Sequence, residues 1–164
     1  MIFGVNATKT AVVVTQTRGA CAKFVITTIR PIPFQVRSGD DLADLLQTLT
    51  TLFAGKGKGR GAGPVLALLK CSSGRFGSCL EAIKGEAMVE LAAAQRGLRI
   101  VKIAPQSLKK ALGCAKDQKW RERAGEMFNP GGKRPNWSKG AAGAVAAAFK
   151  LAGESLASRS DNGK

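Results

Sequence analysis

Near the amino terminus, three short stretches are rich in apolar and β-branched residues. They cover residues 1–6, 11–17 and 23–29, and each has the length and composition of a β-strand. Because only short connections separate them, we expect an antiparallel meander. Pro31 and Pro33 follow the third stretch and are expected to end it, since proline cannot donate a ladder hydrogen bond.

Beyond the prolines, the pattern predicts a helix and then a buried strand. Leucines recur at helical spacing over residues 41–53, and Ser38 or Asp40 can cap this helix. Residues 65–71 form a continuous apolar run, which is typical of a central strand covered on both faces.

The last part of the chain is predicted to be mostly helical. Residues 79–96 form a long helix, 99–105 a strand followed by a short helix, and 117–128 another helix. Ser138 is expected to cap a final helix over 139–152. On the helix over 79–96, five apolar residues fall on one stripe: Leu80, Ile83, Ala87, Leu91 and Ala94.

The order of elements is therefore β-β-β-α-β-α-β-α, with extra helical material before the last helix. This order predicts an α/β fold with a mixed five-stranded sheet and helices on both faces. We expect one domain over residues 1–157 and a flexible tail over 158–164. No internal repeat is visible in the sequence.

The same order resembles the ribonuclease H-like superfamily. Within it, "VLALLKCSSGRFGSCLEAIKGEAMVELAAAQRGLRIVKIAPQSLKKAL" looks like the central block of RuvC-type Holliday-junction resolvases, and "KGAAGAVAAAFKLAG" resembles their last helix. The resemblance implies two-metal hydrolysis of a phosphodiester, with Mg²⁺ or Mn²⁺ held by carboxylates. The family supplies those carboxylates from the first strand, the fourth strand and the last helix.

None of the matched positions carries an acid here. They are Asn6, Lys70, Gly140 and Gly143. No carboxylate occurs between Glu126 and Glu154, so a shift of one helical turn does not restore the site. The ammonium of Lys70 would repel a metal ion. The resemblance thus implies a pseudo-nuclease without a metal site and without a cofactor.

The charge of the chain points to a polyanionic partner. Its 26 lysines and arginines against 11 acids give a net charge of +15, which attracts DNA or RNA. Its lack of histidine excludes Ser-His-Asp and Cys-His catalysis. The four cysteines are scattered singly, so we expect reduced, mostly buried thiols and no zinc site: Cys21, Cys71, Cys79 and Cys114.

We expect nucleic acid to contact cationic side chains and one aromatic ring that can stack on a base. These residues are Lys9, Lys56, Lys58, Arg60, Lys70, Arg75, Phe76, Lys84, Lys109, Lys110, Lys133, Arg134 and Lys139. Trp120 and Trp137 lie among further cations and either stack on bases or belong to the core.

Two alternatives stay open. Glu81, Glu86 and Glu90 could form an unorthodox acid set in an active, metal-dependent nuclease, or they could form a solvated helix face. The chain could also be a scaffold in a nucleoprotein assembly, as a homodimer or with a protein partner. We expect no membrane contact, since no run of 18 apolar residues exists, and a cytoplasmic location, since no secretory signal is visible.

Overall fold

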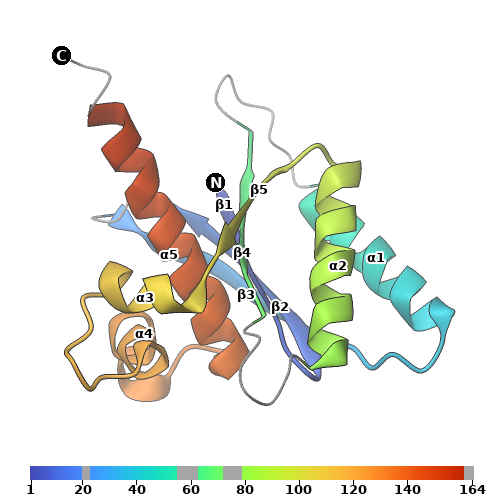
Figure 1. Ribbon diagram of the computed structural model, residues 1–164, viewed down its shortest axis with the longest axis horizontal. Coiled ribbons are helices and arrows are strands. Elements are labelled where there is room, and N and C mark those ends of the chain that lie inside the picture. Colours follow the sequence, from blue (N-terminus) through green and yellow to red (C-terminus); the bar gives the residue numbers. More distant parts are fainter. Residues whose placement is uncertain (20–22, 55–62, 72–78, 161–164) are drawn as a thin grey trace.

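A five-stranded mixed sheet forms the centre of the molecule (Figure 1). The computed structural model describes residues 1–19, 23–54, 63–71 and 79–160. The strands lie in the order β3-β2-β1-β4-β5. They are β1 (Ile2–Ala7), β2 (Ala11–Arg18), β3 (Val25–Pro33), β4 (Val65–Leu69) and β5 (Arg99–Ile103). The first three strands pair antiparallel, and β4 and β5 add parallel to β1. The predicted fold class is confirmed.

The prediction that Pro31 and Pro33 end the third strand was wrong. β3 does not stop before Pro31 but continues through Pro33, with Pro31 opposite Val13 and Pro33 opposite Ala11. β3 is the edge strand of the sheet, and an edge strand needs only one row of backbone donors for its single neighbour. Proline is therefore tolerated there, as it would not be in a central strand.

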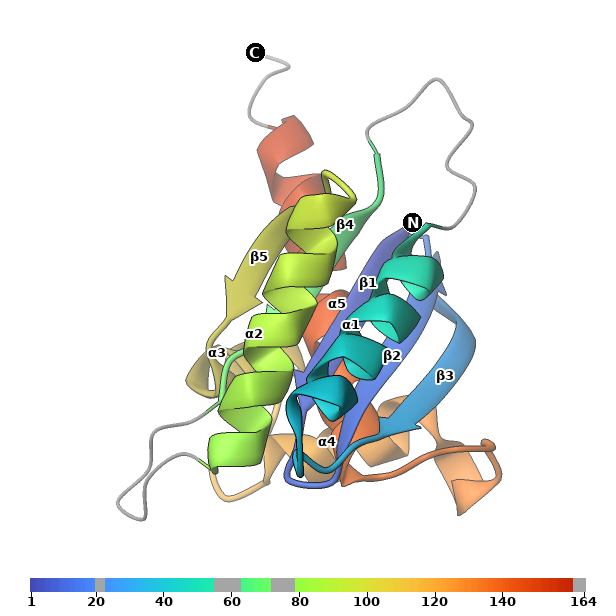
Figure 2. The ribbon, with the colours of Figure 1, turned by 90° about the vertical axis from the view of Figure 1, so that its right-hand side faces the viewer.

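Helices cover both faces of the sheet. They are α1 (Gly39–Phe53), α2 (Leu80–Gln95), α3 (Pro105–Ala111), α4 (Trp120–Phe128) and α5 (Lys139–Ser160), with a short 3₁₀ turn, η2 (Pro130–Gly132), after α4. α1 and α2 lie side by side on one face, and α5 crosses the other face, with α3 and α4 beside it (Figures 1 and 2). α5 runs to Ser160, beyond the predicted end at 152, so the helix enters the segment expected to be a tail.

The two faces of the sheet carry separate cores. Under α1 and α2, the largest fully buried side chains include Phe3, Leu49 and Leu66, and Phe3 packs edge-on against Phe53. Under α5, small residues dominate. Because alanine and glycine have short side chains, α5 lies very close to the strands, and this close approach shapes the candidate site.

The apolar stripe of α2 faces solvent rather than the core. The residues of α2 that are buried are small or β-branched: Ala82, Gly85, Val89, Ala92 and Ala93. A Cβ on Gly85 would lie 3.1 Å from Val12 Cγ2 and 3.2 Å from Phe34 Cε1. The inner side of α2 is therefore already in tight contact with the sheet, and the larger aliphatic side chains are left outside.

Candidate nucleic-acid interface

A groove lies at the carboxyl ends of β1 and β4, where these two parallel strands meet the first turns of α2, α4 and α5. Its volume is about 690 Å³. Five cationic side chains line it: Lys9, Lys70, Lys119, Arg121 and Lys139. Glu122 is the acidic residue in the lining, and it lies 3.7 Å from Lys119. We call this feature the basic groove.

Asn6, at the end of β1, joins the floor of the basic groove to α5. Its side chain is 9% exposed, and its amide Nδ2 donates to the carbonyl of Gly140 at 3.1 Å. A buried amide of this kind costs free energy unless it is paired. The side chain of Asn6 thus links the first strand to the last helix through a hydrogen bond.

The glycines of α5 allow the close approach that this hydrogen bond requires. A Cβ on Gly143 would lie 2.4 Å from Asn6 Nδ2 and 2.9 Å from Leu69 Cδ2, and one on Gly140 would lie 2.8 Å from Val13 Cγ2. These distances are shorter than any ordinary van der Waals contact. A carboxylate side chain at 143 has no room unless α5 moves away from the sheet.

The four positions matched to the nuclease acids therefore lie together. Asn6, Lys70 and Gly140 line the basic groove, and Gly143 is packed against Asn6. Among the described residues, no cluster of three or more cysteine, aspartate or glutamate side chains could hold a metal ion. The lining offers one amide and one carboxylate, that of Glu122, among five cationic side chains, which does not fit a centre for two hard cations.

Arg121 is the groove cation whose orientation is fixed most clearly. Its guanidinium carbon lies 4.4 Å from the centre of the Trp120 ring, and Trp120 is 9% exposed. A guanidinium on the face of a tryptophan is held by electrostatic attraction. Trp120 is thus a core residue that also orients a cation at the groove.

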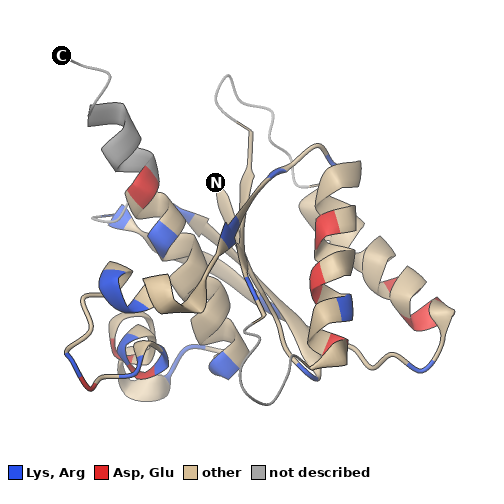
Figure 3. Ribbon diagram, viewed as in Figure 1, with Lys and Arg blue, Asp and Glu red and all other residues tan. Residues whose placement is uncertain are grey.

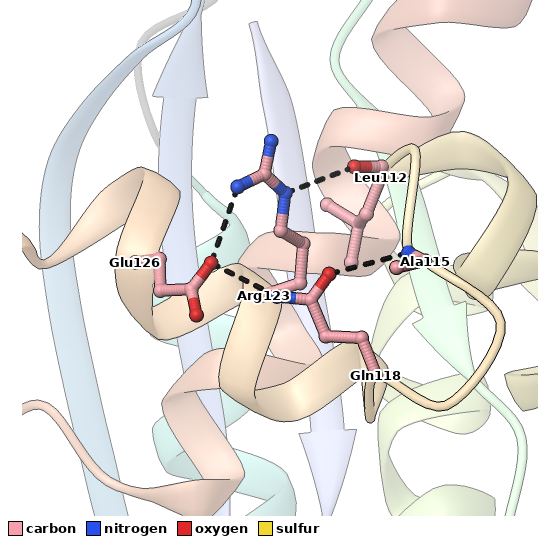
Figure 4. A network of polar contacts seen from close by, with 5 residues as sticks. All are labelled: Leu112, Ala115, Gln118, Arg123 and Glu126. Atoms are coloured by element: carbon pink, nitrogen blue, oxygen red, sulfur yellow. Dashed lines mark hydrogen bonds and ion pairs between the residues drawn. The ribbon is translucent and has the colours of Figure 1, made fainter.

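A polar network holds the start of α4 in place (Figure 4). Arg123 forms an ion pair with Glu126 at 3.1 Å and donates to the Leu112 carbonyl at 3.4 Å. Gln118 accepts from the amide of Ala115 and donates to Glu126. Because this network links the end of α3 to α4, it fixes the position from which Lys119 and Arg121 reach the groove.

Each of the three glutamates of α2 already has a partner. Glu90 lies 2.7 Å from Lys102 of β5, Glu86 accepts from the amide of Cys71 at 3.0 Å, and Glu81 accepts from the Cys79 thiol at 2.7 Å. The hydrogen bond from Cys79 lowers the pKa of Glu81. The alternative acid set is thus occupied by local contacts.

The described cysteines are free thiols, half-buried rather than mostly buried as expected: Cys71, Cys79 and Cys114. Burial, followed by the nearby charge of Glu86, raises the pKa of Cys71 to about 12. This thiol is protonated at neutral pH and is a poor nucleophile.

The structure brings three of the predicted cations together and separates others from them. Lys9, Lys70 and Lys139 line the basic groove. Five predicted cations do not line it: Lys84 on α2, Lys109 and Lys110 on α3, and Lys133 and Arg134 after η2. Five predicted contacts lie outside the described residues: Lys56, Lys58, Arg60, Arg75 and Phe76.

Two groove cations were missed as contacts, Lys119 and Arg121. The signal available in the sequence was their position on either side of Trp120. That signal has meaning only when the tryptophan is known to be buried, because a buried ring fixes the direction in which its neighbours point.

Charge is distributed unequally over the two faces of the sheet (Figure 3). α1 and α2 carry six of the eleven acidic residues: Asp40, Asp41, Asp44, Glu81, Glu86 and Glu90. The cations of the basic groove come instead from the ends of β1 and β4 and the starts of α4 and α5. The groove edge is therefore a cationic side of the molecule, and the α1–α2 face is an acidic one.

No family model matches the sequence, and no curated protein matches it either. Solved structures do match in three dimensions. "T. thermophilus RuvC in complex with Holliday junction substrate" superposes with a TM-score of 0.70 at 12% identity, over 99% of this chain and 97% of that one. "Thermus thermophilus RuvC structure" gives 0.63 at 15% identity, over 91% of this chain and 90% of that one.

The sheet order, the two helical layers and these superpositions define a ribonuclease H-like α/β fold. Within that class, the chain has the RuvC fold along nearly its whole length. None of the helices in the described residues is long and apolar enough to span a membrane.

Proposed function

We propose that this protein binds DNA or RNA through the basic groove and does not cleave it by two-metal hydrolysis. The observation that carries the proposal is the composition of the groove. Five cations surround the place where the matched nuclease positions meet, and those positions hold an amide, an ammonium group and two glycines.

The physical basis is neutralisation of phosphates. Lysine and arginine release counterions from a polynucleotide backbone and bind it without reading its sequence. The first turns of α2, α4 and α5 open onto the same groove, and the amino ends of helices add partial positive charge there. The groove therefore suits the backbone of a nucleic acid, and a RuvC neighbour that holds a Holliday junction supports the same class of partner.

In this proposal, cations of the chain replace metal ions as the counter-charge of the phosphates. Mg²⁺ or Mn²⁺ is then not required for binding. A divalent cation would be needed only if the alternative of an active nuclease holds.

The test is a binding and cleavage assay on single-stranded, duplex and branched DNA and on RNA, each with Mg²⁺, with Mn²⁺ and with EDTA. We expect binding in EDTA, no cleavage with either metal, and an affinity that falls by orders of magnitude between about 50 and about 200 mM salt. Arg121→Gln should weaken binding several-fold, whereas Lys110→Gln, an exposed change on α3 outside the groove, should have a smaller effect. An affinity that stays level with salt would contradict the proposal.

The alternatives have their own signatures. Metal-dependent cleavage that is abolished by Glu86→Gln would favour the active nuclease with the acids of α2. A protein partner that stays bound after nuclease treatment would favour the scaffold.

A further inference from the structure

A second cationic cleft lies at the edge of the sheet, between β3 and residues 133–138, the segment that joins η2 to α5. Its volume is about 330 Å³. Arg30 of β3 and Arg134 of the joining segment line it, together with the polar side chains of Thr27, Thr28 and Asn136. The rest of its lining is apolar, and none of the described residues that line it is acidic. We call this feature the edge cleft.

Hydrogen bonds hold the joining segment in place beside β3. The backbone amide of Arg134 donates to Asn129 Oδ1 at 2.7 Å, and its Nε donates to the carbonyl of Phe128 at 2.9 Å. Asn136 adopts a φ of 59° and donates from Nδ2 to the carbonyl of Ile29 at 3.2 Å. The segment is thus attached both to the end of α4 and to the edge strand. A wall fixed in this way loses little freedom when a ligand binds.

The two guanidinium groups of the edge cleft have donors that the fold does not use. Within the described chain, neither Arg30 nor Arg134 forms an ion pair with a carboxylate. Each guanidinium has five N–H donors, and the Nε of Arg134 uses one of them. Two like charges that line one small cleft repel each other unless an anion lies between them. The arginine fork matches the oxygens of a phosphate group.

The edge cleft lies close to the basic groove. Asn136 is bonded to Ile29 on β3, and four residues later Gly140 is bonded to Asn6 at the end of β1. In the sheet, β2 alone separates β3 from β1, and two strand spacings amount to about 10 Å. A strand of duplex DNA carries one charge for about every 3.4 Å of axis. One strand is therefore long enough to place phosphates at both sites.

We propose that the edge cleft binds a phosphate of the same nucleic-acid strand that occupies the basic groove. This proposal rests on the proposed function of the groove and extends the bound strand from the groove toward the edge strand β3. Arg30 and Arg134 hold the phosphate oxygens from the two walls of the cleft, and the hydroxyl of Thr28 is a further donor. These contacts reach the backbone and not the bases, so they set the direction in which the strand leaves the groove without reading its sequence.

Continuity with the basic groove favours a polynucleotide over other anions as the occupant. An acidic peptide or a free phosphate ion could also meet two guanidinium groups. A polynucleotide, however, gains contacts at the groove and at the edge cleft through one connected backbone, so that binding at the first site raises its effective concentration at the second.

Arg30→Gln and Arg99→Gln form a matched pair that tests the proposal. Both arginines are exposed, and they lie on β3 and β5, the two opposite edge strands. With a single-stranded oligonucleotide that spans both sites, Arg30→Gln should weaken binding several-fold and reduce the slope of log affinity against log salt by about 1. Arg99→Gln removes the same charge and should leave both nearly unchanged. Arg30→Lys keeps the charge but loses the fork, and its affinity should be intermediate.

The Nε–H resonances of the arginines locate the contact in the native chain. In isotope-labelled protein, the oligonucleotide should shift the resonances of Arg30 and Arg134 and leave that of Arg99 in place. Polyglutamate or inorganic phosphate at the same concentration of charge should shift them less. Larger shifts with either of these two anions than with the oligonucleotide would overturn a nucleic-acid strand as the occupant.

The variants also distinguish a failure of the edge cleft from a failure of the groove. If Arg121→Gln weakens binding while Arg30→Gln acts no differently from Arg99→Gln, the groove binds nucleic acid and the proposal for the edge cleft is wrong. If the native chain binds no polynucleotide at low salt, the proposed function and the proposal that rests on it are both wrong.

Discussion

At Gly143, the lack of one methyl group decides how closely the last helix approaches the first strand. The Cβ that any other residue would carry has Asn6 Nδ2 at 2.4 Å and Leu69 Cδ2 at 2.9 Å. The hydrogen bond from Asn6 to Gly140 exists because this distance is so short. The same residues that exclude a carboxylate from the groove thus hold β1 and α5 together.

Two glycine-to-alanine changes should therefore change the free energy of unfolding in opposite directions. Gly143→Ala should destabilise the protein by about 1–3 kcal/mol, because its methyl group forces α5 away from the sheet. Gly125→Ala, in α4, has open space around its Cβ and should stabilise by about 0.5–1 kcal/mol through helix propensity. Urea unfolding of both variants measures the difference. A stabilising Gly143→Ala would mean that α5 does not lie this close to β1.

Among the elements, α4 depends on its neighbours for its position. Phe128, at its end, is part of a trio with Phe24 before β3 and Phe149 on α5, with ring centres 5.2–5.4 Å apart. Aromatic pairs at such distances stabilise beyond the area that they bury. The trio fixes one end of α4, and the Arg123 network fixes the other.

Removing the ring at the centre of this contact should loosen α4. Phe128→Ala should lower the free energy of unfolding by about 2–3 kcal/mol. This is somewhat less than the loss at a fully buried phenylalanine, because Phe128 is half-buried. Met127→Ala, one residue earlier and 36% exposed, should change stability by less than about 0.5 kcal/mol. Thermal and urea unfolding measure the stability of both variants. Equal effects of the two changes would show that the aromatic trio does not anchor the helix.

In the molecule as a whole, acids and groove cations are separated. The α1–α2 face is rich in carboxylates, and the groove edge is lined by five cations. Net charge alone would bind a polyanion anywhere on the surface, whereas under the proposed function this separation would direct it to the groove edge.

Two triple variants with the same change in net charge distinguish these cases. Replacing Lys9, Lys70 and Lys139 by glutamine should reduce the slope of log affinity against log salt by about 3, about 1 for each lost phosphate contact. Replacing Lys84, Lys109 and Lys110, which lie outside the groove lining, should reduce it by less than about 1. Equal slopes in the two variants would mean that the whole basic surface binds, and not the groove.

The sequence by itself determined the order of elements and the mixed sheet. Strand and helix follow from periodicities of two and 3.6 residues, which depend on local backbone geometry alone. The residue types at the matched positions are likewise read directly from the sequence, and their match to the acids of a nuclease stays a prediction. Local patterns also misled, as at Pro31 and Pro33, because whether a proline is tolerated depends on which strand lies at the edge.

Only the tertiary structure decided which residues meet. The contact of Gly143 with Asn6 depends on the distance between segments far apart in the chain. The outward direction of the apolar stripe of α2, and of Arg121 beside the buried Trp120, depends on which side of a helix packs inward. The stripe is visible in the sequence, but its direction is not. The side of α2 that packs against the sheet is the one that allows the closest approach. At Gly85 this close packing favours small residues over large apolar ones.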